Sequence, residues 1–369
     1  MKPYIPGPLP PLHIDWQQLA PLIGRANAAL ARYDGLLQTM LNPEILLSPL
    51  TMNEAVLSSK IEGTQASLDE VLEYDAGMRF DRNKNTDIQE IKNYREALLA
   101  AESAIDDGYA FSLNLVTTIH QILMRNVRGE QKSPGAFRKT QNWIGHHGCS
   151  METARFVPPS PTVLLEHMDK WILYVNAEEG DILSHLGIIH AQFEILHPFM
   201  DGNGRMGRIL MPIYLYKRGF LHRPMFYLSE YLEEHRSEYY DALLAVTSEV
   251  NWQRWLEFFL TAVSEQAERN FIKAREIVAL YERSKGEIVR LTRSQFALPA
   301  LDTLFAHPIF SSSDFMAKVG IKNRATANTI LTQLRSGGVI TEIRPSSGRS
   351  PAIYGFHVLL NIAEGKKML

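Results

Sequence analysis

The sequence has a single cysteine, Cys149, so no disulfide can form within its 369 residues. It contains no run of about 18 apolar residues, which argues against a membrane-spanning helix. Residues 1–6 form no apolar signal core, and with the low cysteine content this predicts a cytoplasmic location. Neither sign of charge is in excess, because 38 basic and 41 acidic residues give a formal net charge of −3. That balance excludes a general attraction to nucleic acid or anionic lipid but leaves room for a local basic face.

The composition is that of a globular protein. Hydrophobic residues make up 45% of the chain and charged residues 21%, values that exclude a fibre or a wholly disordered chain. At about 150 residues per domain, the length predicts two or three domains.

Helical periodicity dominates the sequence and predicts a mainly α fold. Apolar residues recur at three- and four-residue steps from Trp16 to about Leu47. Residues 51–54 have the pattern of a capping box that starts a second helix, which Gly63 would end. The proline-rich residues 3–12 favour an extended strap or a frayed terminus. Further helices are expected over 67–75, 87–106, 112–125, 162–176 and about 181–285.

Two segments depart from the helical pattern. Residues 137–160 are rich in aromatic and β-branched side chains around a Gly-His-His-Gly turn, which predicts a β-hairpin. Near the C-terminus, three helical patterns precede a second predicted hairpin, an order typical of a winged helix-turn-helix. These helices are expected over 297–306, 311–319 and 323–336, and the hairpin strands over 339–343 and 352–356.

The most informative stretch covers residues 197–208 and reads H-P-F-M-D-G-N-G-R-M-G-R. Pro198 ends the preceding helix and leaves His197 at its C-terminal edge. The Gly-Asn-Gly turn can direct backbone N–H groups toward an anion, and a helix beginning near Arg205 adds its positive dipole end. The stretch therefore combines a phosphate cradle, two arginines on one helix face, a carboxylate and an imidazole.

These residues resemble the signature of the Fic family, His-x-Phe-x-(Asp/Glu)-Gly-Asn-Gly-Arg-x-x-Arg, with every fixed position matched. The resemblance implies a helical catalytic core over roughly residues 112–262 with the hairpin as a flap. It also implies transfer of AMP from ATP to a hydroxyl side chain of a target protein, which is a tyrosine, serine or threonine, and to the protein itself. Relatives that act as kinases have lysine at the place of Gly204, and this chain does not.

The resemblance also assigns roles within the stretch. His197 is expected to be the general base, and Asp201 is expected to hold Mg²⁺. Phe199 would anchor the loop in the core. The residues expected to bind the nucleotide are Asp201, Gly202, Asn203, Gly204, Arg205, Met206, Gly207 and Arg208.

A second motif of the family is inhibitory and reads (Ser/Thr)-x-x-x-Glu-(Gly/Asn). Ser58 and Glu62 match it, and their four-residue spacing places them on one helix face. A carboxylate in the last helical turn is disfavoured by the helix dipole, so Glu62 would benefit from a cation. The resemblance implies that this cation is Arg208 and that the pair blocks the γ-phosphate position. The order of the motifs is that of a class II Fic protein.

The resemblance extends to the flap and the adenine site. Ile144, Gly145, His146 and His147 are expected to border the nucleotide, and a target segment would pair with the flap edge. The Tyr239-Tyr240 pair resembles tyrosines that line the adenine site in relatives, although packing in the helix core is an equal alternative. Some relatives carry asparagine where this chain has Thr247, which puts that adenine contact in doubt.

The sequence thus predicts three regions: an N-terminal helical region over 1–110 with the inhibitory helix near 51–63, a Fic catalytic domain over 111–285, and a winged helix-turn-helix over 286–369. Two other functions stay open, a DNA-binding regulator with a Fic input domain and an enzyme that removes AMP. A homodimer is an expectation from the resemblance alone. The basic residues that could face DNA are Lys322, Arg324, Arg335, Arg344 and Arg349.

Overall fold

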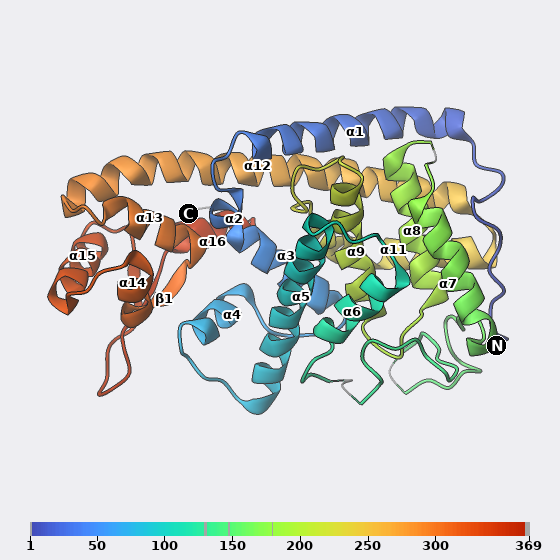
Figure 1. The fold of residues 1–369 in the computed structure, drawn as a ribbon, viewed down its shortest axis with the longest axis horizontal. Helices are drawn as coiled ribbons and strands as arrows, with labels where there is room; N and C mark the ends of the chain where they lie inside the picture. Colours follow the sequence, from blue (N-terminus) through green and yellow to red (C-terminus); the bar gives the residue numbers. More distant parts are fainter. Residues whose placement is uncertain (1, 129–130, 147, 179, 366–369) are drawn as a thin grey trace. The chain divides into compact units, whose positions relative to one another are not determined.

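The computed structural model describes residues 2–128, 131–146, 148–178 and 180–365. Helices account for most of this part of the chain, as predicted, and the described strands form one small antiparallel sheet (Figure 1). Within these residues no helix is both long enough and apolar enough to span a membrane.

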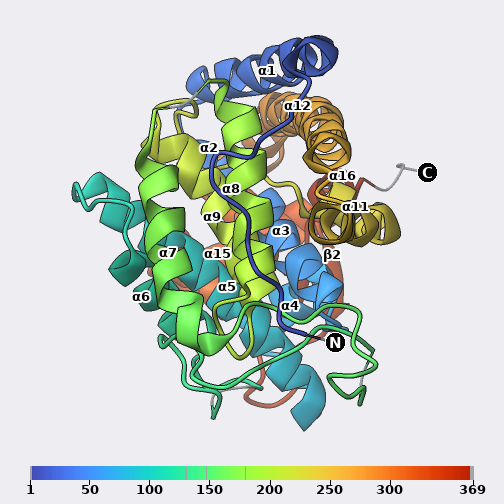
Figure 2. The same ribbon diagram turned by 90° about the vertical axis from the view of Figure 1, so that its right-hand side faces the viewer.

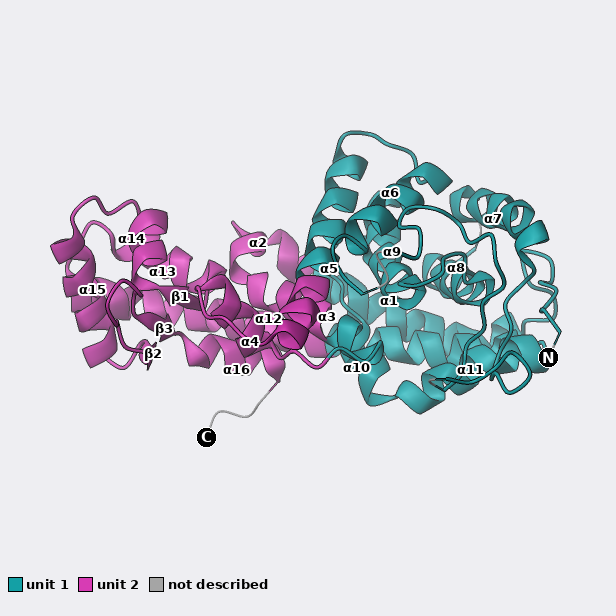
Figure 3. Ribbon diagram, turned by 90° about the horizontal axis from the view of Figure 1, so that it is seen from below, with its two compact units in different colours: residues 1–34, 57–64, 92–268 teal, residues 35–56, 65–91, 269–369 magenta. Residues whose placement is uncertain are grey.

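The chain divides into two compact units, each assembled from separate segments (Figure 3). Unit 1 contains residues 1–34, 57–64 and 92–268, and unit 2 contains residues 35–56, 65–91 and 269–369. Four helices contribute residues to both units, namely α1 (Trp16–Gln38), α3 (Ser48–Ile61), α5 (Arg82–Asp106) and α12 (Trp252–Thr292).

The centre of unit 1 is a pair of helices, α8 (Ile182–Leu196) and α9 (Asn203–Lys217), which are buried along nearly their whole length (Figure 2). The remaining helices around them are α6 (Leu113–Leu123), α7 (Pro161–Asn176) and α11 (Arg236–Ser248). Because α8 and α9 have apolar residues on every side, they belong inside a helical layer rather than at its surface. The loop between them carries the motif stretch.

Helix α1 (Trp16–Gln38) lies along the first part of α12 within unit 1 (Figures 1 and 2). Gln18 donates to Glu257 at 3.0 Å, and Arg32 pairs with Glu268 at 3.2 Å. The prediction of one helical pattern from Trp16 to about Leu47 was right as far as Gln38 and wrong beyond it. The chain breaks after Gln38 and resumes as the short α2 (Pro43–Leu46), because a proline starts a helix well but cannot continue one.

The capping box predicted at residues 51–54 was also wrong. Helix α3 begins earlier, at Ser48, so Thr51 lies inside it with its hydroxyl directed at the Leu47 carbonyl, 3.4 Å away. A capping box does occur at the next helix, α4 (Leu68–Asp75), where Ser67 and Glu70 each accept from the other's backbone N–H. The predicted stop at Gly63 is confirmed, since this residue has a φ of +100° just after α3.

The predicted hairpin over 137–160 is reduced to a single antiparallel bridge between Ile144 and Phe156. Ile144 N donates to Phe156 O at 2.8 Å, and Phe156 N donates back at 3.0 Å. Pairing ends there, because the Pro158-Pro159 sequence has no N–H groups to continue a ladder. Tyr4 of the proline-rich N-terminus donates from its backbone to Val157 O at 3.0 Å, so this terminus is a strap against the segment.

In unit 2, three helices and a hairpin occur in the predicted order. The helices are α13 (Ala297–Ala306), α14 (Ser312–Val319) and α15 (Arg324–Ser336), and the sheet order is β1 (Ile309–Ser311), β3 (Ile353–Gly355), β2 (Thr341–Arg344). In register, Ile309 pairs with Gly355, which in turn pairs with Thr341. Strand β1 and the last helix, α16 (His357–Glu364), were not predicted. Interpretation of this unit as a winged helix stays a prediction. Helix α10 (Ser229–Glu234) belongs to unit 1.

Candidate active site

The motif loop is shaped by two residues with left-handed backbone angles. His197 caps the C-terminus of α8 with φ of 46° and ψ of 58°, and its N–H donates to Phe193 O at 3.0 Å. Gly202 caps the N-terminus of α9 with a φ of 77°. A Cβ at Gly202 would also overlap the Met124 sulfur, so only glycine fits here. The predicted position of His197 at a helix end is confirmed.

Asn203 closes this loop with its side chain. Its Oδ1 accepts from Phe199 N at 2.8 Å and its Nδ2 donates to Phe199 O at 2.9 Å. Because both side-chain groups are engaged and buried, Asn203 offers a ligand only its backbone. Phe199 is buried and stacks on His120 with ring centroids 3.6 Å apart, so it anchors the loop in the core.

His120, on α6, is a functional residue that the sequence analysis missed. Its Nε2 lies 2.9 Å from Asp201 O and its Nδ1 accepts from Gly135 N at 2.9 Å. A carbonyl cannot donate, so this pattern requires the proton on Nε2. Burial lowers the pKa of His120 to about 4, which keeps the ring neutral. It thereby holds the carbonyl that precedes the glycine turn.

Arg138 is a second missed residue, since the sequence suggested only a flap position for it. The side chain is buried, with Nε 2.9 Å from His197 O and Nη2 within hydrogen-bond distance of Pro159 O and Leu196 O. Burial lowers its pKa to about 10, so it stays charged at neutral pH. A cation at the C-terminus of α8 satisfies the helix carbonyls and fixes the backbone of His197.

We expect Arg138→Leu to lower the free energy of unfolding by about 2–4 kcal/mol, because several carbonyls would lose a charged donor inside the protein. Urea unfolding followed by circular dichroism measures this. The matched control is Arg125→Leu, which removes a surface pair with Glu96 and should cost less than about 1 kcal/mol. Equal stability of the two variants would contradict the structural role of Arg138.

The ring of His197 is suited to accept a proton. Burial lowers its pKa to about 4, so the imidazole is neutral at pH 7. Its Nδ1 lies 3.4 Å from the carbonyl of Glu194, an orientation that leaves Nε2 as the basic nitrogen.

Asp201 lies at the mouth of the loop and is one-third exposed. Its Oδ2 accepts from Lys132 Nζ at 2.8 Å, and its Oδ1 accepts from Gly202 N at 2.7 Å. Oδ2 is therefore an oxygen already placed to face a cation. The described residues contain no cluster of three or more His, Cys, Asp or Glu side chains that could hold a metal ion. One carboxylate fits Mg²⁺ that arrives with phosphates, because that ion keeps most of its other ligands as water and phosphate oxygens.

Arg208, the last residue of the motif, is held by the end of α3. Its Nη2 lies 2.7 Å from Glu62 Oε1, its Nε donates to Ser58 Oγ at 2.8 Å, and Nη2 also donates to Ser58 O at 2.9 Å. Arg208 and Ser58 are fully buried, while a third of the Glu62 side chain is exposed. Glu62 follows the helix by one residue rather than lying in its last turn. Burial alone would raise the pKa of Glu62, but the charge and hydrogen bond of Arg208 lower it overall.

Glu62 approaches the start of α9 so closely that a side chain at Gly204 is excluded. A Cβ there would overlap Glu62 Oε1 and lie 3.0 Å from Arg208 Nη1. Met206 and Gly207 are both buried, so the Met206 side chain is directed into the core and Gly207 has no side chain to offer a ligand. Arg205 is also buried, with Nη2 3.9 Å from Asp201 Oδ1.

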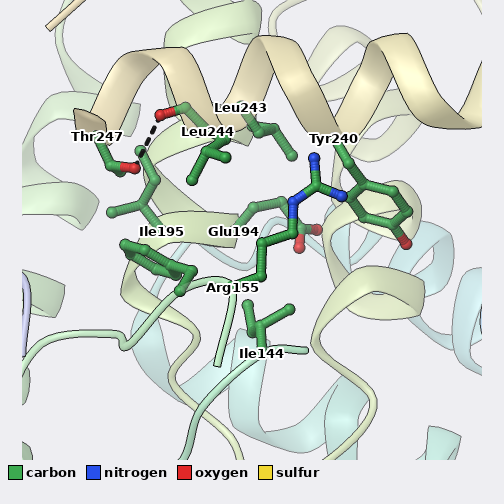
Figure 4. A pocket seen from close by; sticks show the side chains of 9 residues that line it. Ile144, Arg155, Glu194, Ile195, Tyr240, Leu243, Leu244 and Thr247 are labelled. Carbon is green, nitrogen blue, oxygen red and sulfur yellow. Dashed lines mark hydrogen bonds between the residues drawn. The ribbon is translucent and has the colours of Figure 1, made fainter. Parts of the chain in front are cut away.

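A pocket with about 480 Å³ of empty space, open solvent at its mouth included, is lined in part by the last turn of α8, which precedes the loop (Figure 4). It brings together Ile144, Tyr240 and Thr247, which the sequence analysis had connected with the nucleotide. Tyr239 does not reach it, because this ring is buried and its hydroxyl lies 2.9 Å from His190 Nε2. The remaining pocket residues, which the sequence did not indicate, are Arg155, Phe156, Glu194, Ile195, Leu243 and Leu244.

Two further flap residues lie near Ile144 but do not line this pocket. Gly145 is packed so closely that a Cβ would overlap the Cys149 sulfur. His146 is exposed. His147 lies outside the described residues.

The basic residues proposed to face DNA are partly engaged within unit 2. Arg335 pairs with Glu342, and Arg344 donates to Pro351 O at 3.3 Å. Lys322, Arg324 and Arg349 are exposed. A DNA-binding role stays a prediction.

Two family models match the chain: the Fic/DOC family N-terminal model over residues 20–103 and the Fic/DOC family model over residues 110–215. Together they cover about half of the sequence. A probable protein adenylyltransferase of Aquifex aeolicus is 30% identical over 189 residues, 48% of this chain and 52% of that protein. Protein adenylyltransferase Fic of Aedes aegypti is 29% identical over 135 residues, 36% of this chain and 24% of that protein. The chain thus spans between about a quarter and about half of these relatives' lengths.

Solved structures show the same fold. A Fic family protein from Desulfovibrio desulfuricans has a TM-score of 0.58 and 21% identity, covering 96% of this chain and 98% of its own. Fic-1 from Caenorhabditis elegans has a TM-score of 0.54 and 20% identity, covering 70% and 73%. The resemblance predicted from the signature is therefore confirmed, and this chain belongs to the Fic/DOC family.

Proposed function

We propose that this protein is an autoinhibited protein adenylyltransferase, which transfers AMP from ATP to a tyrosine, serine or threonine hydroxyl of a target protein. The observation that carries the proposal is the motif loop itself. A neutral His197 precedes a glycine turn at the start of α9, and the same helix carries the buried Arg208. The guanidinium of Arg208 is held by the carboxylate of Glu62, which directly follows α3. The relatives named as protein adenylyltransferases support the same reaction.

In this reaction the target hydroxyl oxygen attacks the α-phosphorus, a new P–O bond forms and pyrophosphate leaves. Nε2 of His197 accepts the hydroxyl proton, which its neutral state allows at pH 7. Backbone N–H groups at the start of α9 and the guanidinium of Arg205 would stabilise the phosphate oxygens. Asn203 and His120 act by holding that backbone in place.

Asp201 would hold Mg²⁺ through the oxygen that now faces Lys132. Bound Mg²⁺ would supply positive charge to the phosphates. Lys132 is half-exposed, so its ammonium can move into solvent when a divalent ion takes its place. The adenine would occupy the pocket lined by Ile144 and Tyr240, where apolar and aromatic side chains suit a flat ring.

The inhibited state follows from the contacts of Arg208. A guanidinium whose Nε and Nη2 already bind Ser58 and Glu62 is not available to a γ-phosphate. Arg236 donates to the carbonyl of Ile61 and Lys60 lies 3.4 Å from Glu233, so two further contacts fix the end of α3. Movement of this helix end would release Arg208 for ATP.

The target protein would dock along the flap segment. Among the described residues of this segment, the one bridge that pairs it internally is between Ile144 and Phe156. Backbone groups on its free edge can pair with an extended target strand and carry a hydroxyl toward His197.

The test of the reaction is transfer of label from α-labelled ATP with Mg²⁺ to the protein itself and to lysate proteins. Glu62→Gly should label strongly, and Glu62→Gly combined with His197→Ala should lose at least about a thousandfold of that rate, because no base remains. ATP binding should survive in the double variant. Undiminished labelling without His197 would overturn the assigned mechanism. Loss of label from an added AMP-modified protein would instead favour AMP removal.

A further inference from the structure

The last turn of α8 carries a carboxylic acid, Glu194, that none of the roles above uses. It lines the same pocket as Tyr240 (Figure 4). Its Oε1 is buried and has no hydrogen-bond partner in the part of the chain that the structure describes. In this structure Oε1 faces Gly207 of α9, and rotation about the side-chain bonds would turn it into the pocket, where a ligand group can make the missing bond.

The rest of the pocket suits a flat heteroaromatic ring. Its walls are mainly apolar, and Tyr240 supplies an aromatic face with the Arg155 guanidinium 6.0 Å from the ring centroid. Figure 4 shows Glu194 and Arg155 as the acidic and basic side chains among these apolar groups. A purine can lie between such walls and turn one edge toward the carboxyl group.

The protonation state of Glu194 decides which edge it can recognise. Burial raises its pKa to about 8, against a lowering effect of Arg208 and with a further raising effect of Glu62. The group is therefore mainly protonated at pH 7, with one O–H donor and one carbonyl acceptor. Adenine has the complementary pair, an amino group that donates and a neighbouring ring nitrogen that accepts.

We propose that Glu194 binds the amino-bearing edge of adenine and thereby selects ATP over a purine nucleotide that lacks the 6-amino group. The proposal rests on the proposed function for the presence of ATP, and it adds the residue that determines base specificity. One oxygen of Glu194 accepts from the amino group, and the other donates to the adjacent ring nitrogen.

The surroundings of Glu194 argue against a purely structural role. The neighbouring helix α9 leaves room for the carboxyl, since a Cβ at Gly207 would overlap Glu194 Oε1. A carboxyl that contributed to stability would have its buried oxygen paired, and Oε1 of Glu194 has no partner among the described residues. Replacement by leucine should therefore leave the melting temperature unchanged or raise it.

The experiment measures binding of two nucleotides by calorimetry, with Mg²⁺, to the full chain carrying Glu62→Gly. The nucleotides are ATP and purine riboside 5′-triphosphate, which lacks the amino group. We expect about a tenfold preference for ATP. Adding Glu194→Leu should reduce this preference to about onefold, whereas Glu194→Gln, which keeps a donor and an acceptor, should retain it. The matched control is Glu166→Leu on the exposed face of α7, which should change nothing.

Each outcome decides the matter. A tenfold preference that persists in Glu194→Leu, or equal binding of both nucleotides to the Glu62→Gly protein, would overturn the role of Glu194. If ATP binds with the expected preference but no label is transferred, the proposed function fails while the role of Glu194 is upheld by the ratio. Absence of binding for both nucleotides would overturn both proposals.

Discussion

Replacing Glu62 with glycine should raise the rate of AMP transfer by about 10- to 100-fold over the unmodified protein. A charge-assisted hydrogen bond contributes about 1.5–3 kcal/mol, and each 1.4 kcal/mol corresponds to a factor of ten. The contact concerned is the 2.7 Å bond between Arg208 Nη2 and Glu62 Oε1. Because a third of Glu62 is exposed, solvent screening favours the lower part of this range. Initial rates with α-labelled ATP measure the change.

Two companion variants separate the ion pair from a general loosening of α3. Lys60→Gly places glycine near the same helix end without touching Arg208, and we expect less than a threefold increase. Glu62→Gln keeps the shape but removes the charge, so its rate should lie between those of the unmodified protein and Glu62→Gly. Equal activation by Lys60→Gly and Glu62→Gly would show that the ion pair is not what inhibits the enzyme.

The second large effect concerns stability in acid. Four histidines are held neutral because burial lowers their pKa values, His120, His185 and His197 to about 4 and His190 to about 3. In the unfolded chain these rings titrate near 6.5. Between pH 6.5 and 4 the unfolded state therefore binds more protons than the folded state, and stability falls as the pH falls. Each histidine contributes about 3–5 kcal/mol to this loss.

Since a domain is stable by only about 5–15 kcal/mol, the four together should unfold the protein before pH 4 is reached. Urea unfolding at a series of pH values measures the slope. His185→Gln should flatten the slope below pH 6.5 by about one quarter, because Gln does not titrate. The exposed His222→Gln is the control and should leave the slope unchanged. A slope in His185→Gln equal to that of the unmodified protein would contradict the assignment.

Much of the fold could be predicted because it depends on local signals. The periodicity of apolar residues placed the helices from 181 to 285 and the three C-terminal helices. The errors occurred where a local pattern had two interpretations. The Thr51 pattern resembled a capping box, yet helix α3 begins three residues earlier, and the flap lacks the paired strands that its composition suggested. Strand formation depends on pairing with a neighbouring strand, which no local sequence pattern specifies.

The sequence alone identified the family and the residues that form the motif loop. Glycine and proline restrict or widen the backbone angles through steric effects that act over only a few residues. The left-handed turn at Gly202 could therefore be predicted from the sequence. Ser58 and Glu62 could also be assigned from their spacing, although only the folded chain shows them on Arg208, 150 and 146 residues away.

Only the tertiary structure revealed the roles of residues that act at long range. His120 holds the carbonyl of Asp201, 81 residues away, and Arg138 holds the end of α8 from 59 residues away. It also separated the two tyrosines, placing Tyr239 in the core and Tyr240 in the pocket with Glu194. The physical reason is that burial and pKa depend on which distant segments pack together. A histidine, an arginine or a glutamate in a sequence carries no sign of the environment that folding will give it.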